Sequence, residues 1–302
     1  MARLMARTAL GLVVAMLVAV TAMRAQGPQT PAGEWRSANF DNSANRYSPL
    51  DRITPANVTQ LERVWSFHLK PAGYTGRPRE DEAIPLVIGG TMYLASPYGA
   101  IHALDATTGV EKWKFTLPNN DQPSKRGLAY WPGDGTAPPS LIFGGLSGGM
   151  FSLKASDGTL NDSFGDHGVV NLKTPEVMQT GMNLAYSLLT APTIYKNLII
   201  TGAGVGEGPG GSNAGSGPAG DTRAWDARTG RLVWTFHTVP RPGEFGADTW
   251  RENSAKNRSG VNVWGYMSLD EQRGILYMPL GAPNNDRVGV DRPGDNLDRK
   301  ST

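Results

Sequence analysis

The sequence predicts an all-β protein, and more narrowly a β-propeller of four-stranded antiparallel blades. Glycine contributes 38 and proline 22 of the 302 residues, well above the usual combined share of about 12%, which favours many turns over long helices. Short apolar or alternating runs closed by Gly, Asn or Asp turns are typical of strands. A sequence pattern also recurs at blade-like intervals. A β-sandwich with coincidental turns is the alternative architecture.

The expected strands follow one another closely along the chain. A short helix is also expected near residues 55–61, because Thr54 can cap it and Pro55 suits its first turn. We expect strands over residues 83–88, 91–95, 101–104, 111–115, 141–143, 197–201, 232–237 and 274–280, with another strand around 261–269.

The repeat has the pattern A-x-D-x-x-x-G-x-x-x-W. It is complete from Ala103 to Trp113 and from Ala224 to Trp234, and it is degraded over residues 152–162. Residues 64–67, Val-Trp-Ser-Phe, resemble the end of an earlier copy. The aspartate can bond the turn backbone, the glycine supplies a positive φ, and the tryptophan can cover the seam to the next unit. Such units stack radially into a propeller.

The N-terminus has the layout of a signal peptide. Arg3 and Arg7 precede an apolar run too short for a typical membrane span, so we expect a signal peptide over residues 1–25, with an N-terminal anchor as the alternative. A Gly/Pro-rich linker over 26–34 follows it. No later segment is expected to cross a membrane, and the mature chain is expected in the periplasm or outside the cell.

Composition excludes several classes of protein. The chain has no cysteine, which rules out disulfides and thiolate chemistry. Its net charge is +2, and three of the positive charges lie in the expected leader, so nothing favours a nucleic-acid partner. The segment 206–211 fits G-x-G-x-x-G, but Pro209 and further Gly, Ser and Asn follow where a nucleotide-binding helix should begin.

The docking tryptophans resemble those of the quinoprotein dehydrogenases, propeller enzymes that use pyrroloquinoline quinone (PQQ). Further segments resemble this family in order, and Trp-Thr-Phe-His at 234–237 is most similar to its glucose/quinate-type branch. These segments are residues 45–50, 82–89, 126–130, 234–237, 262–265 and 292–296. The resemblance implies an eight-bladed ring of which residues 35–297 form about half, followed by an atypical tail over 298–302. It also implies that the family's catalytic aspartate lies beyond Thr302, so we expect a truncated chain without activity of its own.

The resemblance implies a set of site residues. Glu82, Arg126, Thr190 and Trp264 are similar to cofactor-binding positions, with Arg126 facing a PQQ carboxylate and Trp264 forming the floor under the ring system. For the metal, Ca²⁺ or Mg²⁺, Glu207 matches a ligand position and Asn284 is the nearest match to a second one.

The reaction implied is oxidation of a sugar, polyol or alcohol hydroxyl, with electrons passing to ubiquinone or a cytochrome. Glucose, quinate and other polyols or alcohols stay open as substrates. A non-catalytic periplasmic β-propeller that serves as a scaffold or binding module is the alternative function.

Overall fold

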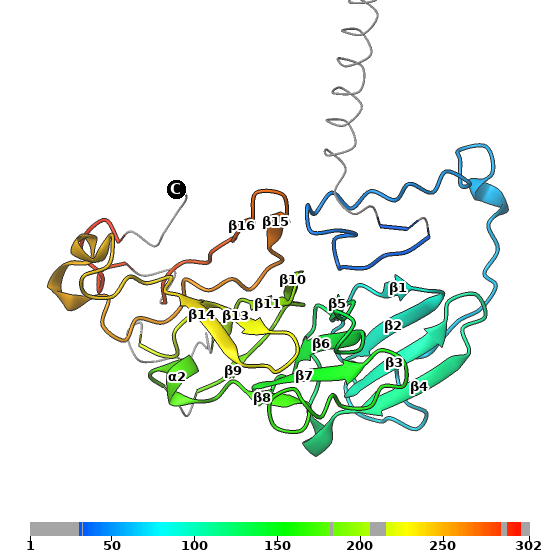
Figure 1. Ribbon diagram of the computed structural model, residues 1–302, viewed down its shortest axis with the longest axis horizontal. Helices are drawn as coiled ribbons and strands as arrows, with labels where there is room; N and C mark the ends of the chain where they lie inside the picture. The colour runs from blue at the N-terminus through cyan, green and yellow to red at the C-terminus, as the bar shows by residue number, and fades with distance from the viewer. Residues whose placement is uncertain (1–29, 32, 182–183, 206–215, 285–288, 297–302) are drawn as a thin grey trace, which may run out of the picture.

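The computed structural model describes residues 30–31, 33–181, 184–205, 216–284 and 289–296. It contains three four-stranded antiparallel sheets, which are set side by side in an arc and in each of which the strands pair in chain order (Figure 1). The prediction of antiparallel propeller blades is thereby confirmed. The first blade contains β1 (Leu86–Ile88), β2 (Thr91–Ser96), β3 (Ala100–Asp105) and β4 (Glu111–Thr116); the second contains β5 (Ala129–Trp131), β6 (Ser140–Gly144), β7 (Gly149–Lys154) and β8 (Val169–Asn171); the third contains β10 (Thr193–Tyr195), β11 (Leu198–Thr201), β13 (Thr222–Asp226) and β14 (Leu232–Phe236).

Smaller elements accompany the blades. A hairpin of β15 (Ser268–Asp270) and β16 (Ile275–Tyr277) follows the third blade, and β9 (Tyr186–Ser187) pairs with β12 (Gly204–Val205). The expected helix at 55–61 is only a 3₁₀ turn, Val58–Gln60. The remaining helical pieces are also short: α2 (Pro175–Met178) and 3₁₀ turns at Pro118–Asn120, Ala247–Thr249 and Arg251–Asn253.

The repeated turn forms as the sequence indicates. Asp105 Oδ1 accepts hydrogen bonds from the backbone N–H groups of residues 107 and 108 and from the Thr108 hydroxyl. Asp226 makes the same three bonds with residues 228 and 229. The glycines of the two turns have φ values of 73° and 68°, in the region that favours glycine. The side chain of each aspartate therefore closes the turn that starts the last strand of its blade.

Tryptophans cover two of the seams between units. A Cβ placed on Gly158 would lie 2.5 Å from Cε3 of Trp113, and one on Gly109 would lie 2.6 Å from the ring of Trp65. The Trp113 indole N–H also donates to the carbonyl of Ala155 at 3.2 Å. The first blade is thus fastened to the second by a ring lying flat on a glycine, as expected for a docking tryptophan.

The seam between the second and third blades differs. The degraded repeat has Asp162 where a tryptophan would stand, and Gly230 of the third blade instead meets the side chains of Val170 and Phe164. Phe164 is fully buried in the cluster that joins these two blades, together with Trp225. An aliphatic and a phenyl group fill the place of the indole.

The ends of the chain fall mostly outside the described residues. This applies to the expected signal peptide, to most of the linker and to the tail at 298–302. Trp35 lies against the first blade, since its backbone exchanges hydrogen bonds of 2.8 and 2.9 Å with Val87. In the part of the chain that the structure describes, no helix has both the length and the apolar character for crossing a membrane.

Candidate functional site

The segments that join successive blades reach the same face of the arc. A sheet of four antiparallel strands begins and ends on one side, so each connection starts and finishes there. Residues 117–128 lead into the second blade, 172–192 into the third, and 237–267 into the last hairpin, while 69–85 precede the first blade. Arg126, Thr190, Trp264 and Glu82 lie on these four connections, one on each.

The four predicted cofactor-binding residues meet in the structure. Arg126 Nη2 forms an ion pair of 2.8 Å with Glu82 Oε2. Its Nη1 donates to the backbone carbonyl of Trp264 at 3.1 Å, and the guanidinium lies over the Trp264 indole at 5.3 Å from the ring centroid. The Thr190 hydroxyl donates to the same Trp264 carbonyl at 2.5 Å. Residues separated by up to 138 positions in the sequence are therefore in direct contact.

Exposure distinguishes Trp264 from the structural tryptophans. Its surface is 50% exposed, whereas Trp131 and Trp225 are at most 3% exposed. A large flat apolar ring gains free energy when another flat molecule covers it, by loss of apolar surface and by stacking. The half-exposed indole, with a cation over it, is thus suited to a planar anionic ligand.

Tyr266 supports this arrangement from the side of the chain that leads to β15. Its hydroxyl donates to the backbone carbonyl of Arg126 at 3.0 Å. Burial raises the pKa of Tyr266, and the nearby Arg126 charge opposes that rise only in part. The protonated phenol therefore persists at neutral pH and can hold the backbone of Arg126. Tyr266 was not singled out from the sequence, although it follows Trp264 by two positions.

Asn262, two residues before Trp264, also escaped the sequence analysis. Its amide nitrogen donates to the carbonyl of Ala203 at 2.7 Å, and its backbone carbonyl accepts from Gly281 at 3.0 Å. The side-chain oxygen is buried and has no donor among the described residues. An orphaned buried oxygen calls for a water or ion. The motif Asn-Val-Trp-Gly at 262–265 was a signal for it.

Glycines allow the backbone to approach this segment closely. A Cβ on Gly202 would lie 2.0 Å from the carbonyl oxygen of Val263, and a Cβ on Gly281 would lie 3.3 Å from the indole nitrogen of Trp264. Any larger residue at 202 would displace the chain segment that carries the indole. The backbone at Gly202 therefore approaches the Trp264 segment in a way that only glycine permits, and Gly281 packs closely against the indole.

The two predicted metal ligands remain predictions. Glu207 lies outside the described residues. Asn284 is half-buried, and its backbone bonds the carbonyl of Ser259 at 2.9 Å and the guanidinium of Arg258 at 2.8 Å. Gly281, three residues earlier, is the position that meets the indole. Among the residues with described positions, no group of three or more acidic or histidine side chains could hold a metal ion.

The family is decided by comparison with known proteins. The family described as "PQQ: Glucose/ethanol/alcohol dehydrogenase, beta-propeller domain" matches residues 35–302. The chain belongs to this family. The fold recognised from the docking tryptophans and the family named from the sequence motifs are both confirmed.

Individual relatives agree with this assignment. The chain is 32% identical to the dehydrogenase subunit of an alcohol dehydrogenase (quinone) from Gluconobacter oxydans, over 88% of this chain and 35% of the relative. It is 27% identical to a quinate/shikimate dehydrogenase (quinone) from Acinetobacter baylyi, over 85% and 34%. The crystal structure of quinohemoprotein alcohol dehydrogenase from Comamonas testosteroni matches with a TM-score of 0.70 and 28% identity, over 91% and 39%. The chain thus spans about a third of the length of these relatives.

Proposed function

We propose that this chain carries the PQQ-binding face of an oxidoreductase that oxidises a sugar, polyol or alcohol hydroxyl. The observation that carries the proposal is the convergence of Arg126, Thr190 and the half-exposed Trp264 from three separate connections. Family membership and the alcohol, glucose and quinate enzymes among the relatives support it.

The donor set fits the cofactor. PQQ is flat and carries three carboxylates, and the site offers a guanidinium, a hydroxyl and an indole. The guanidinium and the hydroxyl both donate to a single oxygen, the Trp264 carbonyl, so they are already aimed at one point. A carboxylate oxygen near that point would accept both bonds, and bonds between charged partners are stronger than those to a carbonyl. Glu82 keeps Arg126 in position meanwhile through its ion pair.

The remaining roles follow from these contacts. Bound PQQ would supply the quinone that accepts two electrons from the substrate. Trp264 would cover one face of that ring system and exclude water from it, and Arg126 would hold its negative charge. We also propose Ca²⁺ as the metal, with Glu207 and Asn284 as oxygen ligands of the kind this ion prefers. No residue of this chain is proposed as the catalytic base.

The broader biological setting is part of the same proposal. The substrate would be a small molecule with an oxidisable hydroxyl, and ubiquinone or a cytochrome would accept the electrons. Residues 1–25 would direct the protein to the periplasm or out of the cell. Identities of 27% to 32% to glucose, quinate and alcohol enzymes single out no one substrate.

Equilibrium binding of PQQ tests the site directly. PQQ added with Ca²⁺ should quench tryptophan fluorescence in the parent protein. Arg126→Gln should weaken binding by about tenfold or more, because it removes a charge-assisted bond worth about 1.5–3 kcal/mol. Arg231→Gln is a matched control, since Arg231 is an exposed arginine in the turn between β13 and β14. Equal affinity in the two variants would overturn the role of Arg126.

A dye-linked oxidation assay tests the activity. With PQQ and Ca²⁺ present, ethanol, glucose and quinate would be compared as electron donors. A parent protein that neither binds PQQ in the fluorescence titration nor oxidises any of these donors would refute the enzyme proposal and favour the non-catalytic scaffold.

A further inference from the structure

A cleft lies between the segment that follows α2 and the segments before β13 and after β14. It has a volume of about 640 Å³ and is lined by residues from four segments, at 179–180, at 217 and 219–221, at 239–242, and at 247, 250, 253 and 255–258. None of Glu82, Arg126, Thr190 and Trp264 lines it. Its size falls within the range of about 300–1,000 Å³ that is typical of small-molecule sites.

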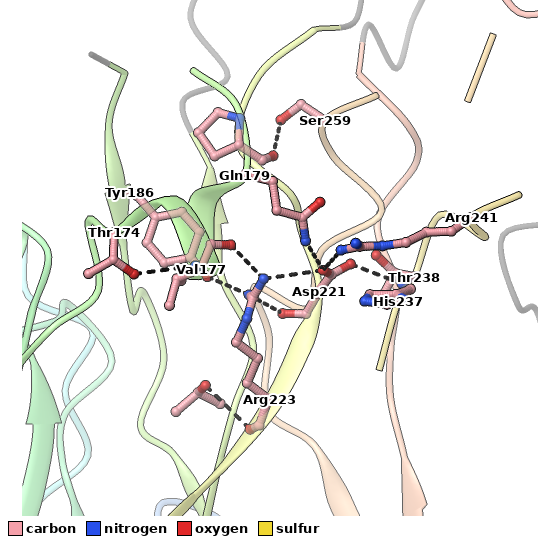
Figure 2. Close-up of polar contacts among 12 residues, drawn as sticks. Thr174, Val177, Gln179, Tyr186, Asp221, Arg223, His237, Thr238, Arg241 and Ser259 are labelled. Carbon is pink, nitrogen blue, oxygen red and sulfur yellow. Dashed lines mark hydrogen bonds and ion pairs between the residues drawn. The ribbon is translucent and has the colours of Figure 1, made fainter. Parts of the chain in front are cut away.

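A buried carboxylate organises the floor of this cleft. Asp221 is 5% exposed and pairs with Arg223, which is 1% exposed, at 3.2 Å. Asp221 Oδ2 also accepts from the amide of Gln179 at 2.9 Å and faces the guanidinium of Arg241 at 3.8 Å. Its Oδ1 accepts from the backbone N–H of Thr238 at 3.2 Å. Figure 2 shows these groups converging on Asp221. The carboxylate is therefore used to fix Gln179 and Arg241 in place.

Once the ion pairs within the protein are taken into account, the charges that remain at the cleft surface are positive. Four charged residues line it, namely Asp221, Arg241, Lys256 and Arg258. Arg223 balances Asp221, and Asp291 balances Arg258 through an ion pair of 3.0 Å. The side chain of Arg241 is 44% exposed, and Lys256 is exposed without an acidic partner among the described residues. Two cations thus face the cleft, and their field favours an anion.

The remaining lining is suited to hydroxyl groups on an apolar frame. Three amide side chains, those of Gln179, Asn253 and Asn257, border the cleft, and an amide can both donate to and accept from a hydroxyl. All three residues have φ between 56° and 63°, a conformation that costs energy outside glycine and persists where the surroundings impose it. Val239, Pro240, Pro242 and Trp250 supply the apolar wall.

We propose that this cleft binds a small hydroxylated carboxylate of the sugar-acid type. Arg241 and Lys256 hold the carboxylate, and the three amides contact the hydroxyls. The proposal does not depend on PQQ binding, because none of its residues belongs to the candidate cofactor site.

Isothermal titration of the full chain with three probes tests this inference. D-gluconate should bind, and D-glucose should bind at least tenfold more weakly because it lacks the carboxylate. Inorganic phosphate should also bind more weakly, because it lacks the chain of hydroxyls that would reach the three amides. Arg241→Gln and Lys256→Gln should each weaken gluconate binding about tenfold, which corresponds to about 1.4 kcal/mol. Arg231→Gln should leave it unchanged.

Each possible result of these titrations either supports or overturns the proposed sugar-acid site. Gluconate binding no tighter than glucose binding, or unaffected by both substitutions, overturns the proposal. Phosphate binding as tight as gluconate binding would reduce the cleft to an unselective anion site and overturn the assignment of a sugar acid. Circular dichroism of each variant verifies that the sheets are intact. PQQ affinity should be the same in Arg241→Gln and the parent, so a failure here is distinguishable from a failure of the cofactor site.

Discussion

Replacing Gly158 with alanine should separate two reasons for glycine at the blade turn. The residue has a φ of 73°, and an added Cβ would lie 2.5 Å from Cε3 of Trp113. The positive φ costs an alanine about 1–2 kcal/mol. Overpacking against a ring that is held by its own hydrogen bond should add about 1–3 kcal/mol. We therefore expect the free energy of unfolding to fall by about 2–5 kcal/mol in urea denaturation.

Gly90 offers a control with the same backbone conformation. Its φ is 72°, and a Cβ there would meet nothing within 4 Å. Gly90→Ala should therefore cost only the part due to φ, about 1–2 kcal/mol. In a Trp113→Leu background, Gly158→Ala should become about as costly as Gly90→Ala. Equal losses for Gly158→Ala and Gly90→Ala in the parent protein would refute the idea that the tryptophan docks on the glycine.

Three further predictions concern charged and titrating groups. Arg223→Met leaves the Asp221 carboxylate buried without its main partner, so it should destabilise the protein by about 3–5 kcal/mol in urea, and the added change Asp221→Asn should recover part of this loss. Burial lowers the pKa of the His102 imidazole, and its hydrogen-bond partner Glu111 opposes this only in part. The unfolded state therefore takes up more protons than the folded state as the pH falls below about 6.5. Melting curves should show that His102→Gln loses less stability than the parent between about pH 7 and pH 5. Backbone and side-chain hydrogen bonds lower the pKa of Asp134. Its contribution to the stability of the folded protein is therefore complete above about pH 3.9 and is lost as the pH falls below that value. Asp134→Asn should make the melting temperature depend less on pH below about pH 3.9.

Most of the fold could be predicted from short patterns in the sequence. The turn aspartates and glycines and the alternating strands act over fewer than fifteen residues, and the docking tryptophans occupy a fixed place in the same short repeat, so all of them could be recognised without coordinates. The helix expected at 55–61 shrank to one 3₁₀ turn because Val58–Gln60 buries no side chain. A capping residue alone does not sustain a helix that packs against nothing.

The site was harder to predict, because its contacts join distant segments. Arg126, Thr190 and Trp264 were found through motifs that match a family. Tyr266 and Asn262 were missed because their roles depend on partners at Arg126 and Ala203, which no local pattern relates to them. The Asp221–Arg223 pair shows the same limit: its two residues are two positions apart in the sequence, but Gln179 and Arg241 reach it only through folding.

The unlike seams have a consequence for recombining such proteins. The first two units share a ring-on-glycine joint, so a segment carrying both the indole and the matching glycine could be exchanged between relatives at that joint. The joint before the third unit relies on Phe164 and Val170 against Gly230. A graft made there would bring an indole to a place already filled by these side chains. Chimeras of this family should therefore tolerate a crossover at the joint between the second and third units less well than a crossover that keeps these two units together.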